Sequence, residues 1–291
     1  MKPLAKKLIL GTANFGMAYG LKNNFSQIQR SNVSELLETC VELGVYKLDT
    51  AIDYGKADKI IGSQKIQHFQ ITTKIQIKDL KVLPRSIKKI EKHFENLRVS
   101  KVKSILVHDA DTASTEDLYR AFEILNYLRD QKYCDTFGIS IYDPNVLETL
   151  HDDYKVDLIQ CPFNVLDNRI GKYYYRNLND MESTKIQVRS LFLQGLFFIP
   201  SNSLPNYFNK WKHIFEEIKR ICEYNKISIY DFLLREAVHS DFIDEIVIGF
   251  DNKTQLQSLF MCNFDTKYSE LIDLSDFKNN LNLCDPRLWE R

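Results

Sequence analysis

Four side chains that can hold or transfer a proton follow three short apolar runs in the first half of the chain. Asp49 and Tyr54 lie at and just beyond the end of the first run, Lys74 near the end of the second, and His108 at the end of the third. If the runs are neighbouring parallel strands, their carboxyl ends meet at one edge of a sheet and the four side chains converge. Each residue alone has a common structural role, such as capping a turn or packing in a core. Together they predict a catalytic group.

This combination suits proton transfer to a carbonyl oxygen. A free phenol has a pKa of about 10 and is a weak acid at neutral pH. An adjacent ammonium favours the phenolate, so we expect Lys74, held by Asp49, to lower the pKa of Tyr54. The imidazole of His108 can share the proton or bind the substrate oxygen. A proton donor of this kind is needed where a hydride attacks a carbonyl carbon.

The elements that must position this group are strands alternating with helices. Runs rich in Ile, Val and Leu predict strands at residues 8–11, 46–49, 69–75, 102–108, 136–141, 156–163, 186–193 and 245–249. Such composition is typical of parallel strands buried on both faces. Segments with 3.6-residue periodicity between them predict helices. One is capped by Ser31 and ended by Gly44, one is capped by Ser114 and Asp117, and one has an apolar stripe that begins at Trp211.

This alternation predicts an α/β fold, a (β/α)8 TIM barrel with a C-terminal helix and tail, formed by residues 1–291 as a single domain. A doubly wound open sheet is the second option, but the glycine-rich phosphate turn that normally follows its first strand does not occur. No metal-ligand spacing such as H-E-x-x-H or H-x-H occurs either, so we predict no metal site. Residues from about 265 onward predict the terminal helix and a tail anchored by Trp289.

Composition excludes several classes of protein. The chain has 291 residues, of which 44% are hydrophobic and 27% charged, and its 39 basic and 39 acidic residues give a formal net charge of zero. This balance provides no general attraction for nucleic acid, and no apolar run is long enough to span a membrane. The six cysteines are scattered in apolar segments, as expected for reduced, buried thiols, and the turn residues after residue 10 argue against a signal peptide. We therefore expect a cytoplasmic protein that acts on a small molecule.

Several short segments, in order along the chain, resemble the aldo-keto reductase superfamily. They are Leu-Asp-Thr-Ala and Asp-Tyr-Gly within 48–55, Thr-Thr-Lys at 72–74, Val-His-Asp at 107–109, Gly-Ile-Ser at 138–140 and Ile-Gln-Cys-Pro-Phe-Asn at 159–164. The resemblance spans residues 8–260 and implies a barrel that reduces an aldehyde or ketone with NADPH, with NADH as the second option. It implies a catalytic tetrad of Asp49, Tyr54, Lys74 and His108, in which Tyr54 is the general acid. The segments at 10–16 and 285–287 resemble a bacterial branch of surface-polysaccharide and nucleotide-sugar pathways, which implies a sugar-derived substrate and carbohydrate metabolism.

The same resemblance implies a cofactor site built from several strand ends. Its residues are Thr12, Ser140, Gln160, Arg189, Ser190, Leu191, Leu196, Gly249, Asn252, Lys253 and Gln255. Ser140 and Gln160 match residues that hold the nicotinamide carboxamide, and Ile141 replaces the Asn that often follows the serine. Arg189 stands where an aromatic side chain commonly stacks on the nicotinamide, and a planar guanidinium can stack there too.

The remaining cofactor positions match segments that bind phosphates. Ser190, Leu191 and Leu196 match the lining of the diphosphate, and residues 249–256 match the adenosine-phosphate segment. Asp251 stands where many relatives carry Arg, and an acid there repels a 2′-phosphate. We expect Lys253 to compensate with a point charge.

Two other functions are compatible with these residues. A nicotinamide-binding regulatory or redox-sensing subunit with little turnover would keep the tetrad, and a Schiff-base aldolase would use Lys74 without a nicotinamide. We predict a reductase whose partner is a small-molecule carbonyl substrate, and neither nucleic acid nor a membrane. The candidate substrate-pocket residues near strand ends are Phe15, Tyr19, Tyr142, Phe163 and Asn164.

Overall fold

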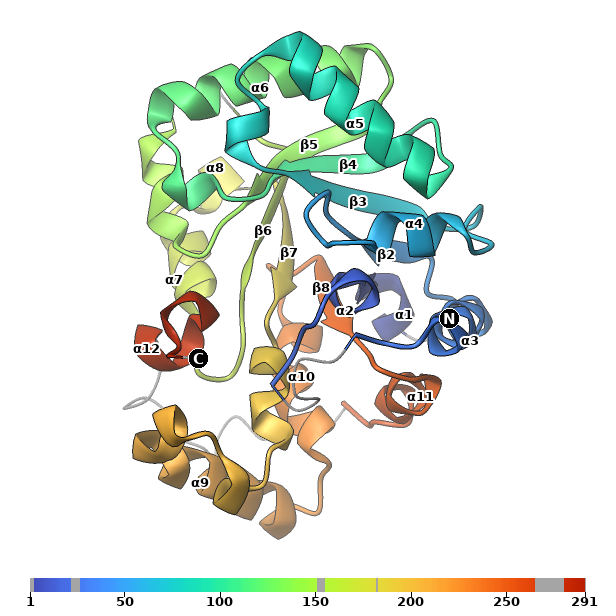
Figure 1. Ribbon diagram of the computed structural model, residues 1–291. Helices are drawn as coiled ribbons and strands as arrows, with labels where there is room; N and C mark the ends of the chain where they lie inside the picture. The colour runs from blue at the N-terminus through green and yellow to red at the C-terminus, as the bar shows by residue number, and fades with distance from the viewer. Residues whose placement is uncertain (1–2, 22–26, 151–154, 182, 265–279, 291) are drawn as a thin grey trace.

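The strands of the protein close into a parallel barrel (Figure 1). The computed structural model describes residues 3–21, 27–150, 155–181, 183–264 and 280–290. In barrel order the strands are β1 (Leu8–Gly11), β2 (Lys47–Asp49), β3 (Gln70–Ile75), β4 (Val102–Val107), β5 (Cys134–Ser140), β6 (Leu158–Pro162), β7 (Lys185–Arg189) and β8 (Glu245–Gly249). Each strand pairs in parallel with the next, and β8 pairs with β1. The (β/α)8 barrel is therefore confirmed and the open sheet is excluded.

Helices surround the strands, as Figure 1 shows. They are α1 (Pro3–Lys7), α2 (Ala13–Gly16), α3 (Arg30–Leu43), α4 (Ala57–Gly62), α5 (Leu83–Leu97), α6 (Thr115–Asp130), α7 (Arg169–Arg176), α8 (Leu178–Met181), α9 (Lys212–Tyr224), α10 (Ile229–His239), α11 (Lys253–Phe260) and α12 (Leu281–Cys284). Short 3₁₀ helices are η1 (Ile77–Asp79), η2 (Ala110–Thr112), η3 (Pro144–Thr149), η4 (Leu193–Phe198), η5 (Ser201–Ser203), η6 (Asn206–Trp211) and η8 (Pro286–Leu288).

The ends of β7 and α3 differ from the sequence prediction. The strand expected at 186–193 stops at Arg189, because Ser190 has a φ of 66° and so leaves the extended conformation. The helix expected to begin after Ser31 begins at Arg30, with Gln29 as its N-cap, so Ser31 lies inside the first turn. Gly44 ends α3 in the left-handed conformation as predicted, with a φ of 79°. The predicted cap of α6 is also confirmed, since Ser114 Oγ accepts from the backbone N–H of Asp117.

A second group of buried apolar side chains lies under α9 and the C-terminal tail. It includes the predicted stripe from Trp211 and the ring of Trp289, which meets the ring of Phe208 edge-on with centroids 4.9 Å apart. Trp289 Nε1 donates to the carbonyl of Leu283 at 3.1 Å. Trp289 therefore anchors the tail as predicted, while most of the helix expected from residue 265 lies outside the described residues.

Three observations concern the cysteines, membrane spans and metal sites considered in the sequence analysis. All six cysteines are free thiols, and every one except the partly exposed Cys262 is buried. Within the described ranges, no helix combines the length and apolar character needed to cross a membrane. The same residues contain no cluster of three or more side chains that could hold a metal ion.

Candidate active site

The carboxyl ends of β2, β3 and β4 bring the predicted tetrad together. Asp49 pairs with Thr72, and Ile75 pairs with Val107, so Lys74 and His108 reach the same end of the barrel as Asp49. Lys74 Nζ donates to Asp49 Oδ1 at 2.5 Å and to Tyr54 Oη at 3.4 Å. The rings of Tyr54 and His108 meet edge-on, with centroids 5.8 Å apart. The four side chains converge as the spacing of the motifs predicts.

Lys74 and Asp49 form a buried ion pair. Their side chains are 1% and 4% exposed, and Lys74 Nζ also donates to the carbonyl of Thr50 at 3.2 Å. Burial lowers the pKa of Lys74, and the adjacent carboxylate of Asp49 opposes that shift. A buried pair persists only when hydrogen bonds satisfy both ions. The ammonium is thus enclosed among its acceptors, which suits it poorly to attack a carbonyl as an aldolase lysine.

The pKa of Tyr54 shifts in the opposite direction from the expected one. Burial raises it, the charge of Asp49 raises it further, and the guanidinium of Arg189 only partly opposes this. Because burial, and after it the charge of Asp49, raise the pKa of Tyr54, the lowering expected from Lys74 is wrong. Burial also lowers the pKa of His108 to about 3, helped by the charges of Lys74 and Arg189. At neutral pH the site therefore holds a protonated phenol and a neutral imidazole.

Two glycines clamp the turn that carries Tyr54. A Cβ on Gly16 would lie 2.0 Å from the carbonyl oxygen of Tyr54, and a Cβ on Gly55 would lie 2.3 Å from the carbonyl oxygen of Gly16. Gly55 also has a φ of 60°, which is costly for other residues. Helix α2 can therefore pack directly against the Tyr54 turn only with glycine at both positions.

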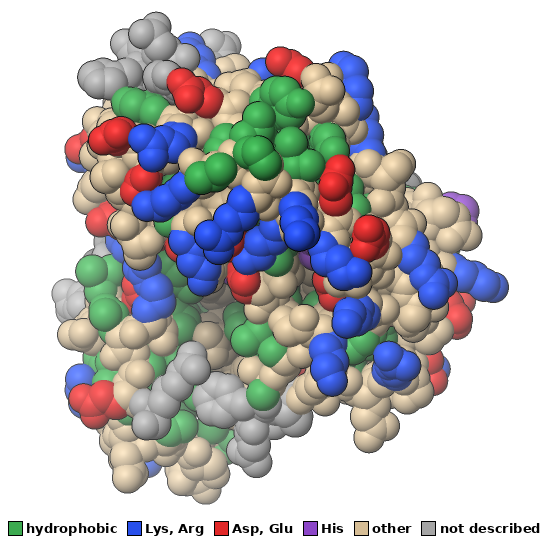
Figure 2. All heavy atoms as spheres, turned by 45° about the horizontal axis from the view of Figure 1, so that its top comes forward, with side chains coloured by type: hydrophobic (Ala, Val, Ile, Leu, Met, Phe, Trp, Pro, Cys, Tyr) green, Lys and Arg blue, Asp and Glu red, His purple; other side chains and the backbone are tan. Residues whose placement is uncertain are grey.

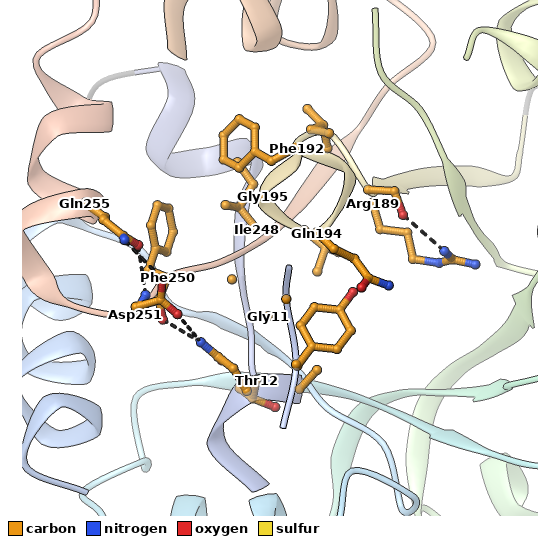
Figure 3. Close-up of a pocket in the computed structure, with 18 of the residues that line it drawn as sticks. Gly11, Thr12, Arg189, Phe192, Gln194, Gly195, Ile248, Phe250, Asp251 and Gln255 are labelled. Atoms are coloured by element: carbon orange, nitrogen blue, oxygen red, sulfur yellow. Dashed lines mark hydrogen bonds between the residues drawn. The ribbon is translucent and has the colours of Figure 1, made fainter. Parts of the chain in front are cut away.

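A cavity extends from Tyr54 between the segments that follow β1, β7 and β8 (Figure 3). The predicted cofactor residues that line it are Thr12, Arg189, Ser190, Leu191, Gly249 and Gln255. Ser140, Gln160 and Leu196 are buried behind its wall rather than on it. Asn252 caps α11 by accepting from the N–H of Gln255, and Lys253 forms an ion pair with Glu35 at 3.3 Å. Neither Asn252 nor Lys253 lines the cavity, and Lys253 is paired with Glu35 rather than with Asp251.

One end of the cavity is acidic. Asp251 accepts from Asn14 Nδ2 at 3.2 Å and from Gln255 Nε2 at 3.1 Å. Figure 3 shows Asp251 and Gln255 on one side of the cavity and Arg189 on the other, with Gly11 and Gln194 between them. Asn14, which the sequence reasoning did not select, fixes this carboxylate, and its own Oδ1 is buried without a partner among the described residues.

The loop after β7 has an unusual backbone. Ser190, Leu193 and Gln194 have φ values of 66°, 44° and 54°, in the region that normally requires glycine. Such residues cost on the order of 1–3 kcal/mol each and cluster at ligand sites. Leu21 N donates to the carbonyl of Gln194, and Asn164 Nδ2 donates to that of Ser190, so neighbouring segments hold the loop in place.

The predicted substrate-pocket residues separate into two groups. Tyr19 lines the cavity, and the ring of Tyr142 packs against the guanidinium of Arg189. Phe15, Phe163 and Asn164 are fully buried and do not line it, so their assignment to the pocket is wrong. Phe15 and Phe163 pack in the apolar core, and Asn164 supports the loop after β7.

A chain of hydrogen bonds runs from the tetrad down the barrel interior. Gln160 Nε2 donates to Asp49 Oδ2 at 2.7 Å and to Gln187 Oε1 at 3.0 Å. Gln187 Nε2 donates to Glu245, which also accepts from Lys47 Nζ at 2.5 Å. Glu245, paired with Lys47, and Asp49 can only accept hydrogen bonds, so the amide groups of Gln187 and Gln160 are turned to donate to them. Gln160 Oε1 is therefore left as a buried acceptor with no partner in the described part of the chain.

Comparison with known proteins identifies the family of the chain. The model of the aldo/keto reductase family matches residues 7–274, most of the chain. The chain belongs to the aldo/keto reductase family. The protein is therefore an NAD(P)H-dependent oxidoreductase, of the class that reduces carbonyl groups. None of the curated proteins matches it by sequence.

Solved aldo/keto reductases share the fold at low sequence identity. A holo form from Bacillus halodurans has a TM-score of 0.68 at 14% identity, over 88% of this chain and 85% of that one. A thermostable enzyme in complex with the inhibitor epalrestat has a TM-score of 0.68 at 16% identity, over 90% and 91%. An enzyme from Klebsiella pneumoniae in complex with NADP and acetate has a TM-score of 0.67 at 14% identity, over 91% and 88%. These likenesses agree with the barrel described above.

Proposed function

We propose that this aldo/keto reductase uses NADPH to reduce the aldehyde or ketone group of a small polar molecule, with Tyr54 as the general acid. The observation that carries the proposal is the convergence of Asp49, Tyr54, Lys74 and His108, with Tyr54 and Asp49 on the wall of the cavity. Sugar-derived carbonyl compounds are the substrate class we favour, with a role in carbohydrate metabolism in the cytoplasm.

The cavity has features that fit a nicotinamide dinucleotide. Asn14, on the cavity wall, has a buried acceptor, Oδ1, without a partner among the described residues, and Gln160 Oε1 is a second such acceptor behind the wall. The strained loop from Ser190 forms one wall. We propose that Thr12, Ser140, Gln160, Arg189, Ser190, Leu191, Leu196, Gly249, Asn252, Lys253 and Gln255 form the cofactor site, those on the cavity wall by direct contact. The Klebsiella relative with NADP supports NADPH as the cofactor, with NADH as the second option.

The side chains then divide the work of the reduction. Bound NADPH supplies the hydride that attacks the carbonyl carbon. As negative charge develops on the carbonyl oxygen, Tyr54 Oη donates its proton to it, which the raised pKa keeps available at neutral pH. The neutral imidazole of His108 offers a hydrogen bond beside the phenol. Lys74, at 3.4 Å, and the charge of Arg189 stabilise the phenolate that forms on Tyr54.

Binding and turnover together test this proposal. We expect saturable quenching of protein fluorescence by NADPH and turnover of a generic aldehyde such as 4-nitrobenzaldehyde. A regulatory subunit would bind NADPH without turnover. If neither NADPH nor NADH binds, the assignment of the cavity to a nicotinamide is refuted.

A further inference from the structure

Arg189 places a positive charge on the cavity wall without a matching acid. Its guanidinium donates to the carbonyl of Ile141 at 3.2 Å and to Ser190 Oγ at 3.3 Å, and it lies 4.0 Å from the centre of the Tyr142 ring. Among the described residues, these partners are all neutral. A guanidinium carries more N–H groups than two acceptors use, so donors remain available at a partly exposed side chain.

A second arginine on the same ring shows the contrast. Arg287 of the tail lies 3.7 Å from the centre of the Tyr142 ring, and the two guanidinium groups must take opposite faces because one face cannot hold both. Arg287 is paired with Asp285 at 2.7 Å and with Asp111 at 3.5 Å. Asp111 and Asp285 therefore both pair with Arg287, while Arg189 forms no ion pair within the described ranges.

The charge of Arg189 lies at the catalytic end of the cavity. Its hydrogen bond to Ile141 directs the guanidinium to the end of β5, which is three strands away from β8 and Asp251 in the closed barrel. It lies near enough to Tyr54 to oppose the rise in the pKa of that phenol. The carboxylate of Asp49 is paired with Lys74 and forms no ion pair with Arg189 in the described part of the chain.

We infer that the substrate carries a carboxylate or phosphate group, which Arg189 binds, in addition to its proposed contact with the cofactor, while Tyr54 protonates the carbonyl oxygen. A partly buried cation is stabilised when an anion joins it, and the planar guanidinium suits the two oxygens of a carboxylate or phosphate. Figure 2 shows lysine and arginine side chains gathered along one border of a hollow on this face of the molecule. The inference rests on the proposed reductase function and names the class of its substrate.

The experiment compares matched charged and neutral substrates. We measure kcat/KM with NADPH for 4-carboxybenzaldehyde and its methyl ester, and for glyceraldehyde 3-phosphate and glyceraldehyde, in the wild type, Arg189→Met and Arg189→Lys. The wild type should prefer one charged member by about tenfold or more, and Arg189→Met should reduce that preference about 10- to 100-fold, as expected for a lost charge-assisted pair. Arg189→Lys should retain part of it. Any change in the proton affinity of Tyr54 affects both members of a pair and cancels in the ratio.

Arg287→Met is the matched control, since it removes a guanidinium from the same ring but one that two acids already pair. Its charged-to-neutral ratio should stay within about twofold of the wild type. The diphosphate of the cofactor is another anion that Arg189 could bind, and the dissociation constant of NADPH, measured by fluorescence, tests this alternative. If Arg189→Met weakens NADPH binding and leaves the substrate ratio unchanged, the cation serves the cofactor diphosphate and the inference is overturned.

Failure of the proposed function has a different signature. A protein that turns over no aldehyde at all contradicts the reductase proposal, and calorimetric titration of the NADPH-loaded protein then decides the inference. Benzoate or inorganic phosphate should bind the wild type more tightly than benzamide does, and the difference should disappear in a folded Arg189→Met protein. Equal binding of all three probes to the wild type refutes an anion site at Arg189.

Discussion

Replacing Tyr54 with Phe is the most direct test of the catalytic assignment. The change removes the hydroxyl and keeps the ring, which packs edge-on against His108. A positioned general acid typically contributes about 10²–10⁴-fold, so kcat for carbonyl reduction should fall by that factor. This corresponds to about 2.7–5.4 kcal/mol of lost transition-state stabilisation.

The structure predicts a small effect of this substitution on stability. The hydroxyl makes a hydrogen bond of 3.4 Å with Lys74, and Lys74 keeps its bonds to Asp49 and to the carbonyl of Thr50 when the hydroxyl is removed. Loss of one long hydrogen bond costs about 1 kcal/mol. For a chain of this size that is a fall in Tm of about 2–4 °C.

The assay follows oxidation of NADPH by its absorbance, with the dissociation constant of NADPH from fluorescence and Tm from a thermal melt. Tyr46→Phe is the matched control, because Tyr46 is an exposed phenol just before β2, at the opposite end of that strand, and its hydroxyl also makes a 3.4 Å bond, to Val41. We expect that variant to retain wild-type turnover. If Tyr54→Phe folds, binds NADPH and keeps full turnover, Tyr54 is not the proton donor, and His108 is the next acid to examine.

Three further substitutions test the charges around the site. Lys74→Met leaves the carboxylate of Asp49 buried without its cation, so denaturant unfolding should show a loss of about 3–5 kcal/mol; adding Asp49→Asn should restore stability but not turnover. The pKa of His108 is about 3 in the folded protein against 6.5 for a free imidazole. As the pH falls, the imidazole of the unfolded chain therefore becomes protonated before that of the folded protein. Stability is therefore lost as pH falls below 6.5, by about 2 kcal/mol at pH 5, and His108→Gln should remove this part of the pH dependence. Asp251→Arg should lower the dissociation constant of NADPH about tenfold or more relative to that of NADH in fluorescence titrations. Asp251→Asn is the control, because it keeps an acceptor for Asn14. An equal effect on both cofactors would place Asp251 away from the 2′-phosphate.

The barrel and the tetrad were predictable because both depend on local signals. Apolar runs followed by turn residues define the strands, and the closure of parallel strands places successive carboxyl ends side by side. Asp49, Lys74 and His108 therefore converge once β2, β3 and β4 are correctly ordered. The glycine of the Asp-Tyr-Gly segment also carries a readable signal, because Gly55 needs a positive φ and close contact with α2.

Other parts of the site depend on contacts that no local pattern encodes. β7 ends where Ser190 enters the left-handed region, and no glycine marks that position. The hydrogen bonds from Gln187 to Glu245 and from Lys47 to Glu245 join residues 58 and 198 positions apart. The only available signal was the presence of polar side chains inside otherwise apolar strands. Likewise, the Asp-Pro-Arg segment of the tail was visible, but its stacking of Arg287 on Tyr142 was not.

The direction of the Tyr54 pKa shift has a consequence for the reaction in each direction. Reduction needs the protonated phenol, and a pKa raised by burial and by Asp49 keeps that form present throughout neutral pH. Oxidation of an alcohol needs the phenolate, which forms only above the raised pKa. Since Lys74 is already paired with Asp49, the unpaired charge of Arg189 is the main cation that favours this phenolate. The rate of reduction should therefore be flat from about pH 6 to 8, whereas the rate of oxidation should rise about tenfold per pH unit over the same range. A flat profile for oxidation would show that a group other than Tyr54 carries the proton.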